Sequence, residues 1–290
     1  MSLKQHLPVF VASSLIMVMA ILLGVTYWQM RTEIITDVSH EVKTVIRNNR
    51  AIMERWVTER RDAIEAVTDS LASAEDPIPF LITANGTGHF DQTFIGYEDK
   101  RMIYHLAEKK QFEGYDPTTR PWYRQANEEK GTIVTAPYLS ASTGELCITV
   151  ARPVPYRIPG VVGGDISLTE IIGLVNSIGL RSQGYAFLST IDGKIVAYPR
   201  PGSALKPVTE IIPGFDISIL KTASDEIVLH EFRFEGVPKY VSASPIPGTD
   251  WVLSIVVDKT TALAPLRSPR RWPIWFPRDE SSGNSSSQAH

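Results

Sequence analysis

The sequence predicts an α+β fold in which a long N-terminal helix carries two α/β modules with antiparallel sheets. Two observations lead to this prediction. The first 75 residues combine an uncharged apolar run with apolar residues repeated at helical spacing. The remaining chain changes to short β-type runs separated by turn residues, and a series of strands with one helical stretch occurs twice.

The composition is that of a chain that buries apolar cores. It has 290 residues, 43% of them hydrophobic, and a formal net charge of -3. Because the charge is small and the Lys and Arg residues are scattered, we exclude nucleic-acid binding. Cys147 is the only cysteine, which excludes an intramolecular disulfide and a multi-cysteine zinc site. We expect Cys147 to be a small apolar residue in a strand.

Residues 8–28 are predicted to form a transmembrane helix. They read PVFVASSLIMVMAILLGVTYW without a charged residue, and a helix needs about 20 apolar residues to cross the hydrocarbon layer. Tyr27 and Trp28 close the run as interfacial aromatics, and Lys4 favours a cytoplasmic location for residues 1–7. A cleaved signal peptide is the alternative, but no small-residue cleavage site follows the apolar run, which favours an uncleaved anchor.

Residues 29–75 are predicted to continue this helix as a stalk. Apolar residues recur at steps of three and four, with charged residues between them. The stripe could pair with a second copy in a homodimer or pack on the chain's own modules, and Asn49 and Glu59 weaken a pure coiled coil. The sequence DPIP at 76–79 ends the helix. The stripe consists of Ile35, Val38, Val42, Val45, Ile52 and Trp56.

Residues 76–180 and 181–258 are the two predicted modules. In the first, HFDQTFIGY pairs with RMIYHL and TIVTAPYLS with LCITVARPV, before the strand VVGGDISL and the helical stretch TEIIGLVNSIGL. In the second, YAFLSTIDGKIVAYP is a hairpin that turns on Asp192-Gly193. Three further strands follow it, in IVLHEFRF, KYVSASPI and WVLSIVVD.

A nine-residue segment carries a family resemblance. Residues 115–123 read YDPTTRPWY, which resembles the signature of double Cache sensor domains, the extracytoplasmic ligand-binding regions of many methyl-accepting chemotaxis proteins and sensor kinases. The resemblance covers most of the chain, since GELCITVARPV, VVGGDISL and GYAFLSTIDGKIVAYP follow in the expected order. It implies two PAS-like Cache modules, of which the membrane-distal one (76–180) binds the ligand. It also implies a single-pass protein of the inner membrane with its sensor domain in the periplasm.

The resemblance further implies an amino acid as the ligand. Family members that bind amino acids look similar at six positions, and this sequence offers a residue for each. Gly164 stands where a larger apolar residue is usual, so we expect a wider or looser wall there. The expected ligand-binding residues are Tyr115, Arg120, Trp122, Tyr123, Tyr138 and Asp165.

These residue types also suit a zwitterion chemically. The guanidinium of Arg120 can hold a carboxylate in two places, and Trp122 and Tyr115 can complete its hydrogen bonds. Asp165 would counter the ammonium, and the two other phenols would offer oxygens or ring faces to the cation. Core packing is the alternative for Trp122 and Tyr123, because both lie in the helix-like stretch WYRQANEEK.

We expect neither enzyme activity nor a cofactor or metal. Nucleophile elbows, dinucleotide loops and phosphate loops do not occur, and the six histidines show no metal-ligand spacing. The second module lacks a comparable set of charges and aromatics and is interpreted as a coupling element. Two other functions stay open: the same fold sensing a polyamine, quaternary amine or carboxylate for a sensor kinase or diguanylate cyclase, and an interaction protein with a vestigial pocket.

Residues 259–290 are interpreted as an aberrant, disordered tail. From Arg267 the chain reads RSPRRWPIWFPRDESSGNSSSQAH, rich in Pro, Ser and Arg. A receptor of the resembled family would continue into a second span and cytoplasmic signalling helices. We therefore expect a truncated or frame-shifted receptor that lacks the signalling domain.

Overall fold

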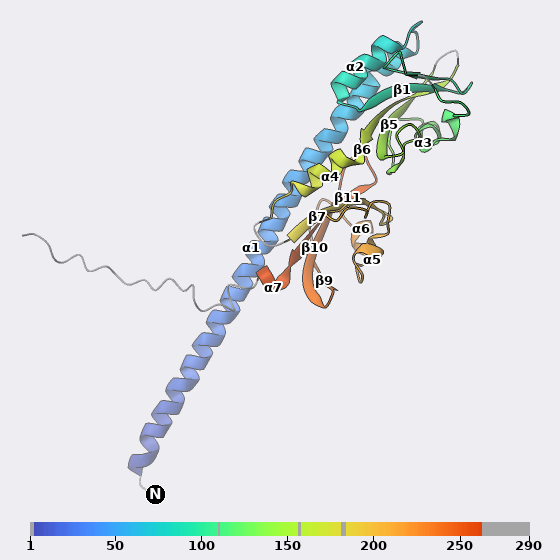
Figure 1. The fold of residues 1–290 in the computed structure, drawn as a ribbon. Helices are drawn as coiled ribbons and strands as arrows, with labels where there is room; N and C mark the ends of the chain where they lie inside the picture. Colours follow the sequence, from blue (N-terminus) through green and yellow to red (C-terminus); the bar gives the residue numbers. More distant parts are fainter. Residues whose placement is uncertain (1–2, 110, 156–157, 181–183, 263–290) are drawn as a thin grey trace, which may run out of the picture. The chain divides into compact units, whose positions relative to one another are not determined.

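The computed structural model describes residues 3–109, 111–155, 158–180 and 184–262. The chain divides into two compact units, of which the larger comprises Glu33–Ala262 and the other contains residues 1–32. Figure 1 shows the larger unit as two antiparallel sheets with helices on both of their faces. The predicted α+β class, with a long N-terminal helix and two antiparallel sheets, is confirmed.

Helix α1 spans Leu3–Leu71 and ends four residues before the predicted end at residue 75. Its N-terminal part contains an 18-residue window with a mean hydropathy of 2.2 and no buried residue. Residues 10–33 are all exposed. By length and composition this stretch can cross a membrane, because its apolar side chains have no protein core around them.

The second half of α1 buries one stripe of apolar side chains within the larger unit. The stripe packs on both sheets, so packing on the chain's own modules accounts for it. Ile52 is 56% exposed, and its predicted place on the stripe is wrong. Met53, seven residues after Ile46 and four before Val57, keeps the helical spacing instead. The buried stripe comprises Val38, Val42, Ile46, Met53, Val57, Ile64, Val67 and Leu71.

The first sheet holds six strands in the order β2-β1-β6-β5-β3, with β4 also paired to β5. Its strands are β1 (Gln92–Tyr97), β2 (Met102–Tyr104), β3 (Ile133–Val134), β4 (Tyr138–Leu139), β5 (Leu146–Val154) and β6 (Gly160–Ser167). Its helices are α2 (Ile78–Gly88), the 3-10 turn η1 (Pro117–Thr119), α3 (Pro121–Glu129) and α4 (Leu168–Asn176). Both predicted hairpins, β1–β2 and β4–β5, are confirmed by their antiparallel pairing.

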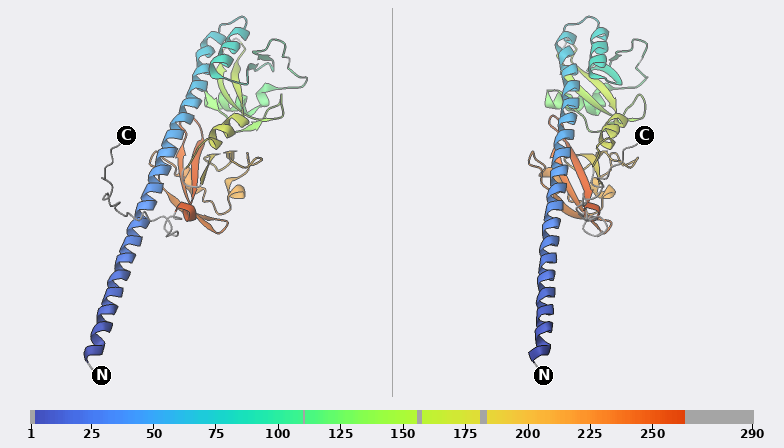
Figure 2. Two further views of the ribbon diagram at one scale, coloured as in Figure 1. Left: turned by 60° about the vertical axis from the view of Figure 1, so that its left-hand side comes forward. Right: turned by 90° about the vertical axis from the view of Figure 1, so that its left-hand side faces the viewer.

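The two faces of the first sheet bury different sets of side chains. Ile95, Ile148 and Ile166 belong to the cluster that includes α1 and α2, whereas Phe94 and Ala151 pack with residues of α3. Figure 1 shows α1 and α3 on opposite sides of this sheet, and both views of Figure 2 show α2 beside the end of α1. Because successive side chains of a strand point to opposite faces, odd-numbered and even-numbered residues of one strand pack on different sides of the sheet.

The second sheet holds five strands in the order β8-β7-β11-β10-β9. They are β7 (Gly184–Thr190), β8 (Ile195–Ala197), β9 (His230–Phe234), β10 (Val237–Pro245) and β11 (Trp251–Asp258), with α5 (Val208–Ile211), α6 (Ser218–Lys221) and α7 (Lys259–Ala262). The β7–β8 turn is confirmed at Gly193, whose φ of 89° suits a residue without Cβ. In IVLHEFRF the strand begins only at His230. Of the predicted tail, Lys259–Ala262 is helical, and residues 263–290 lie outside the described residues.

Candidate ligand-binding site

A narrow cavity lies over one face of the first sheet, and five of the six predicted site residues line it. The centre of a water molecule can occupy about 10 Å³ of it, which is room for about one water. Its walls come from β1, β2, β4 and β6, the start of α3 and residues 112–115 and 140–142. The lining residues are Gln92, Phe94, Met102, Tyr104, Phe112, Tyr115, Arg120, Trp122, Tyr138, Ser140, Ala141, Ser142 and Asp165.

Arg120 reaches the cavity from the junction of two helical turns. η1 ends at Thr119, and Pro121 occupies the first turn of α3, so Arg120 between them is extended with φ -80° and ψ 150°. Its Nη2 donates a hydrogen bond of 2.6 Å to the Leu139 carbonyl, and the guanidinium lies 5.4 Å from the Tyr138 ring centroid. Its Nε is buried without a hydrogen-bond partner. Among the described residues no carboxylate lies within 4.0 Å of this cation, so it retains donor capacity for an anion.

Asp165 lies on β6, in the middle of the sheet. Register places it between Gln92 of β1 and Thr149 of β5. Its Oδ1 accepts hydrogen bonds from the Thr149 hydroxyl at 2.6 Å and the Tyr138 phenol at 3.4 Å. In the described part of the chain no donor is bonded to Oδ2. Burial raises the pKa of this carboxyl to about 6, although the two hydroxyl groups and the Lys109 ammonium favour its charged form.

Aromatic rings close the remaining walls. Trp122 is almost fully buried and its ring centroid lies 4.9 Å from that of Phe94, while Phe112 and Tyr115 lie 4.7 Å apart. Burial raises the pKa of the Tyr115 phenol, and the nearby Arg120 cation and a hydrogen bond from the Trp122 indole oppose that rise. Burial and the Asp165 charge likewise raise the pKa of Tyr138. The phenols are therefore neutral hydrogen-bonding groups at the wall.

Tyr123 and Gly164 do not line the cavity. Tyr123 is buried and packs against Trp122 at 5.6 Å, but it does not line the cavity, so its role as a ligand contact stays a prediction. Gly164 was expected to widen the wall, and this is wrong. Gly164 directly precedes Asp165 on β6 and therefore faces the other side of the sheet. An added Cβ there would lie 2.5 Å from the Phe90 ring.

A comparison with protein families identifies the fold. The family model described as "Cache domain" matches residues 26–266. The chain belongs to the Cache-domain family. This match spans most of the chain, including both sheets and the second half of α1.

Curated relatives of this Cache domain are chemoreceptors. The methyl-accepting chemotaxis protein PctB of Pseudomonas aeruginosa is 30% identical over 249 residues, 82% of this chain and 38% of PctB. PscA of Pseudomonas syringae pv. tomato is 28% identical over 269 residues, 89% of this chain and 42% of PscA. The chain thus spans about two fifths of the length of these relatives.

Solved structures show the same architecture. The ligand-binding domain of the Pseudomonas fluorescens chemoreceptor CtaA in complex with L-isoleucine superposes with a TM-score of 0.67 at 26% identity, covering 81% of this chain and 98% of that one. The ligand-binding domain of PctB in complex with L-Arg superposes with a TM-score of 0.67 at 28% identity. The match covers 79% of this chain and 98% of the PctB chain. The resemblance stated from the YDPTTRPWY segment is therefore confirmed.

Two residues beside Asp165 in the Cache domain were not predicted from the sequence. The Thr149 hydroxyl donates a hydrogen bond to the Asp165 carboxylate, and Gln92, which lines the cavity, lies beside Asp165 on the next strand. Both share the cavity face of the sheet with Asp165, so strand alternation combined with the register could have found them. Register, however, is not evident from a single sequence.

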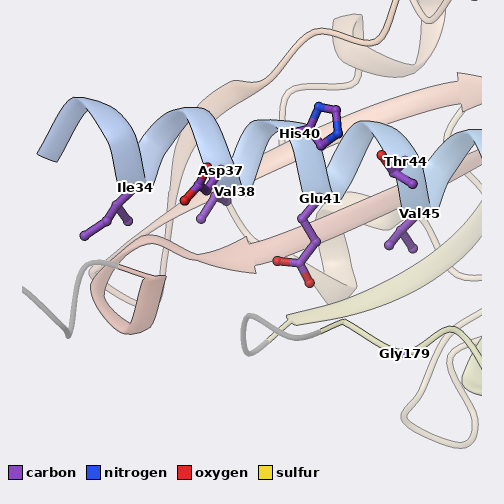
Figure 3. A pocket seen from close by; sticks show the side chains of 8 residues that line it. All are labelled: Ile34, Asp37, Val38, His40, Glu41, Thr44, Val45 and Gly179. Atoms are coloured by element: carbon purple, nitrogen blue, oxygen red, sulfur yellow. The ribbon is translucent and has the colours of Figure 1, made fainter. Parts of the chain in front are cut away.

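A second hollow of the Cache domain, of about 620 Å³, runs along α1. Figure 3 shows that its lining comes from successive turns of this one helix, joined by Gly179, and that Glu41 and His40 leave the helix on opposite sides. None of the described residues that line it is an Arg or a Lys. Within the described residues it therefore lacks the guanidinium and carboxylate that face the cavity over the first sheet.

Proposed function

We propose that the chain is the ligand-binding sensor part of a bacterial chemoreceptor, and that it binds a free amino acid between Arg120 and Asp165. The observation that carries the proposal is one cavity lined by a half-buried guanidinium with an unpaired Nε and by a half-buried carboxylate with an unbonded Oδ2. An amino acid presents a carboxylate and an ammonium on one carbon, and each of these charges needs an opposite partner once it leaves water.

Each group at the wall has a task in this arrangement. The Arg120 Nε–H would donate to the ligand carboxylate, with help from the Trp122 indole and the Tyr115 phenol. Asp165 Oδ2 would accept from the ammonium, which would also lie near the Tyr138 ring. The Tyr138 phenol and the Thr149 hydroxyl would orient the Asp165 carboxylate by donating to its other oxygen, Oδ1. No residue is assigned a catalytic step.

Ligand entry requires the cavity to widen, because its present room is that of about one water molecule. The wall that would open in this proposal is the loop of residues 111–116 before η1, which carries the 44% exposed Phe112. Gln111 ties this loop down, since its side chain accepts from Met102 N and donates to the carbonyls of Lys100 and Tyr115. Loops that open and close over small ligands are common in binding proteins.

The exposed apolar part of α1 supports a membrane location. We propose that residues 8–28 span the inner membrane once, that 29–75 form the stalk, and that 76–180 and 181–258 are the membrane-distal and membrane-proximal modules in the periplasm. A homodimer through the stalk remains part of the proposal. Its test is cross-linking of cysteines introduced at exposed stalk positions such as Arg47 and Ala51.

Calorimetric titration of the detergent-purified full chain against the common amino acids, putrescine and malate tests the proposal. Arg120→Ala should weaken amino-acid binding about 100-fold, because a charge-assisted hydrogen bond is lost and the ligand carboxylate is left unpaired. Arg124→Ala, an exposed position on α3, is the matched control and should bind normally. Failure of every amino acid to bind would refute the proposal, and amine binding that survives Arg120→Ala would favour a polyamine or quaternary amine instead.

A further inference from the structure

A second chamber adjoins the candidate site and has room for the part of the ligand that the first cavity cannot hold. Its volume is about 360 Å³, against about 10 Å³ for the narrow cavity. The two share four lining residues, Gln92, Ser140, Ser142 and Asp165. An amino acid whose ammonium contacts Asp165 would therefore have this chamber open to its side chain.

Among the residues that the structure describes, Lys109 is the lysine that lines that chamber, and its side chain is half-buried. Its Nζ donates a hydrogen bond to the Gln92 side-chain carbonyl and lies 5.0 Å from the Tyr104 ring centroid. Within the described part of the chain no carboxylate lies within 4.0 Å of it. The half-buried Lys239 and Lys259 each have one, Asp258 at 3.5 Å and Glu231 at 2.7 Å. An amide oxygen and a ring face only partly replace an anion, so the ammonium can still take one.

The other charged or titratable groups of the chamber compensate the positive charge of Lys109 only weakly. Asp91 and Glu145 are exposed, so water and salt screen their charges. Asp91 Oδ2 also accepts a 2.6 Å hydrogen bond from the Ser167 backbone. His105 is held by the Thr93 backbone through its Nδ1. Asp165 would be neutralised by the ligand ammonium, which leaves Lys109 as the least screened charge that a described residue directs at the ligand's side chain.

We propose that this chamber receives the ligand's side chain and that Lys109 selects its charge, favouring amino acids whose side chain ends in a carboxylate or amide oxygen over those that end in a cation. The proposal rests on the proposed binding of an amino acid between Arg120 and Asp165. An acidic side chain of the ligand would replace Gln92 as the hydrogen-bond partner of the Lys109 ammonium. A cationic side chain would bring like charges together in a site that is partly shielded from water.

The test compares L-glutamate with L-glutamine, which differ in charge but hardly in shape, and adds L-lysine. The proteins are the full chain and its Lys109→Met variant, which keeps the apolar stem and removes the charge. Lys221→Met, an exposed lysine in α6, is the control. We expect wild type to bind glutamate about tenfold more tightly than lysine, a ratio typical of one unit charge a few ångströms away in a partly solvated site. Lys109→Met should shift the glutamate-to-glutamine affinity ratio about tenfold toward glutamine, and Lys221→Met should leave it unchanged.

The outcomes separate this inference from the proposed function. An unchanged glutamate-to-glutamine ratio in Lys109→Met overturns the role of Lys109, and so does binding confined to amino acids other than these three. In both cases amino-acid sensing itself would stand. If no amino acid binds wild type, the proposed function fails and the selectivity fails with it. Folding of Lys109→Met is checked by retained glutamine binding, because glutamine does not need the charge.

Discussion

The affinity of the candidate site for an amino acid is expected to fall about tenfold between pH 7 and pH 5, because Asp165 changes charge in that interval. Burial raises the pKa of this carboxyl to about 6. At that pKa about nine tenths of the free protein carries the carboxylate at pH 7 and about one tenth at pH 5. Had the pKa stayed at its usual 3.8, more than about nine tenths would remain charged at pH 5, and the affinity would hardly change.

Asp165→Asn separates this titration from all others. The amide cannot take the charge that balances the ligand ammonium, so we expect an affinity loss of about 100-fold at pH 7 and almost no further loss at pH 5. Calorimetric titration of the full chain at pH 5, 6, 7 and 8, with an amino acid whose side chain is uncharged, measures both effects. Asp62→Asn, an exposed position on α1, is the control and should keep the wild-type profile.

Stability should change in the opposite direction. A carboxyl whose pKa is raised in the folded state disfavours folding once the pH is above that pKa, and this penalty disappears as the pH falls below the unfolded value. A rise from 3.8 to about 6 corresponds to about 3 kcal/mol above pH 7. Asp165→Asn should therefore unfold at a higher urea concentration than wild type at pH 8, by somewhat less than this amount because the hydrogen bond to Thr149 changes. The difference should vanish near pH 4.

Two results would refute this reasoning. One is a wild-type affinity that stays constant from pH 7 to pH 5. It would mean that the pKa of the Asp165 carboxyl is not raised, or that this carboxyl does not contact the ligand ammonium. The other is a pH profile of Asp165→Asn that falls as steeply as that of wild type, since the titration would then belong to another group.

Three further predictions concern groups around the site. Arg120→Lys should weaken binding about tenfold by calorimetry, less than Arg120→Ala, because the ammonium keeps the charge but cannot reproduce the guanidinium fork. Affinity within about threefold of wild type would contradict this. Glu170→Ala should lower the unfolding free energy by about 3 kcal/mol in urea titrations. The reason is that Arg60, which is 4% exposed, loses the carboxylate that lies 2.7 Å from its Nη2. A loss under about 0.5 kcal/mol would show that the ion pair is solvated. Gly96→Ala should lower the unfolding free energy by about 1 to 3 kcal/mol and also weaken binding, because the added Cβ would lie 2.7 Å from the Trp122 ring. Unchanged stability and affinity would mean that the ring can shift without cost.

Much of the architecture could be predicted from local patterns in the sequence. The uncharged run at 8–28 and the helical repeat after it predicted one long helix, and α1 is continuous from Leu3 to Leu71. Alternating strands around short turns predicted the β1–β2 and β7–β8 hairpins. These features depend on near neighbours in the chain, because capping, turn geometry and alternation act over a few residues. For the same reason the YDPTTRPWY segment predicted the position of Arg120 before a helix.

Only the tertiary structure decided which side chains share a cavity. Asp165 and Arg120 are 45 positions apart, and they line the same space because β6 lies between β1 and β5 and α3 covers that face of the sheet. Parity placed Gly164 on the opposite face, and packing placed Tyr123 behind Trp122. Lys109, in a segment without regular structure, gave no sequence signal at all. Strand order and the path of loops are set by long-range packing, which the periodicity of a single sequence does not encode.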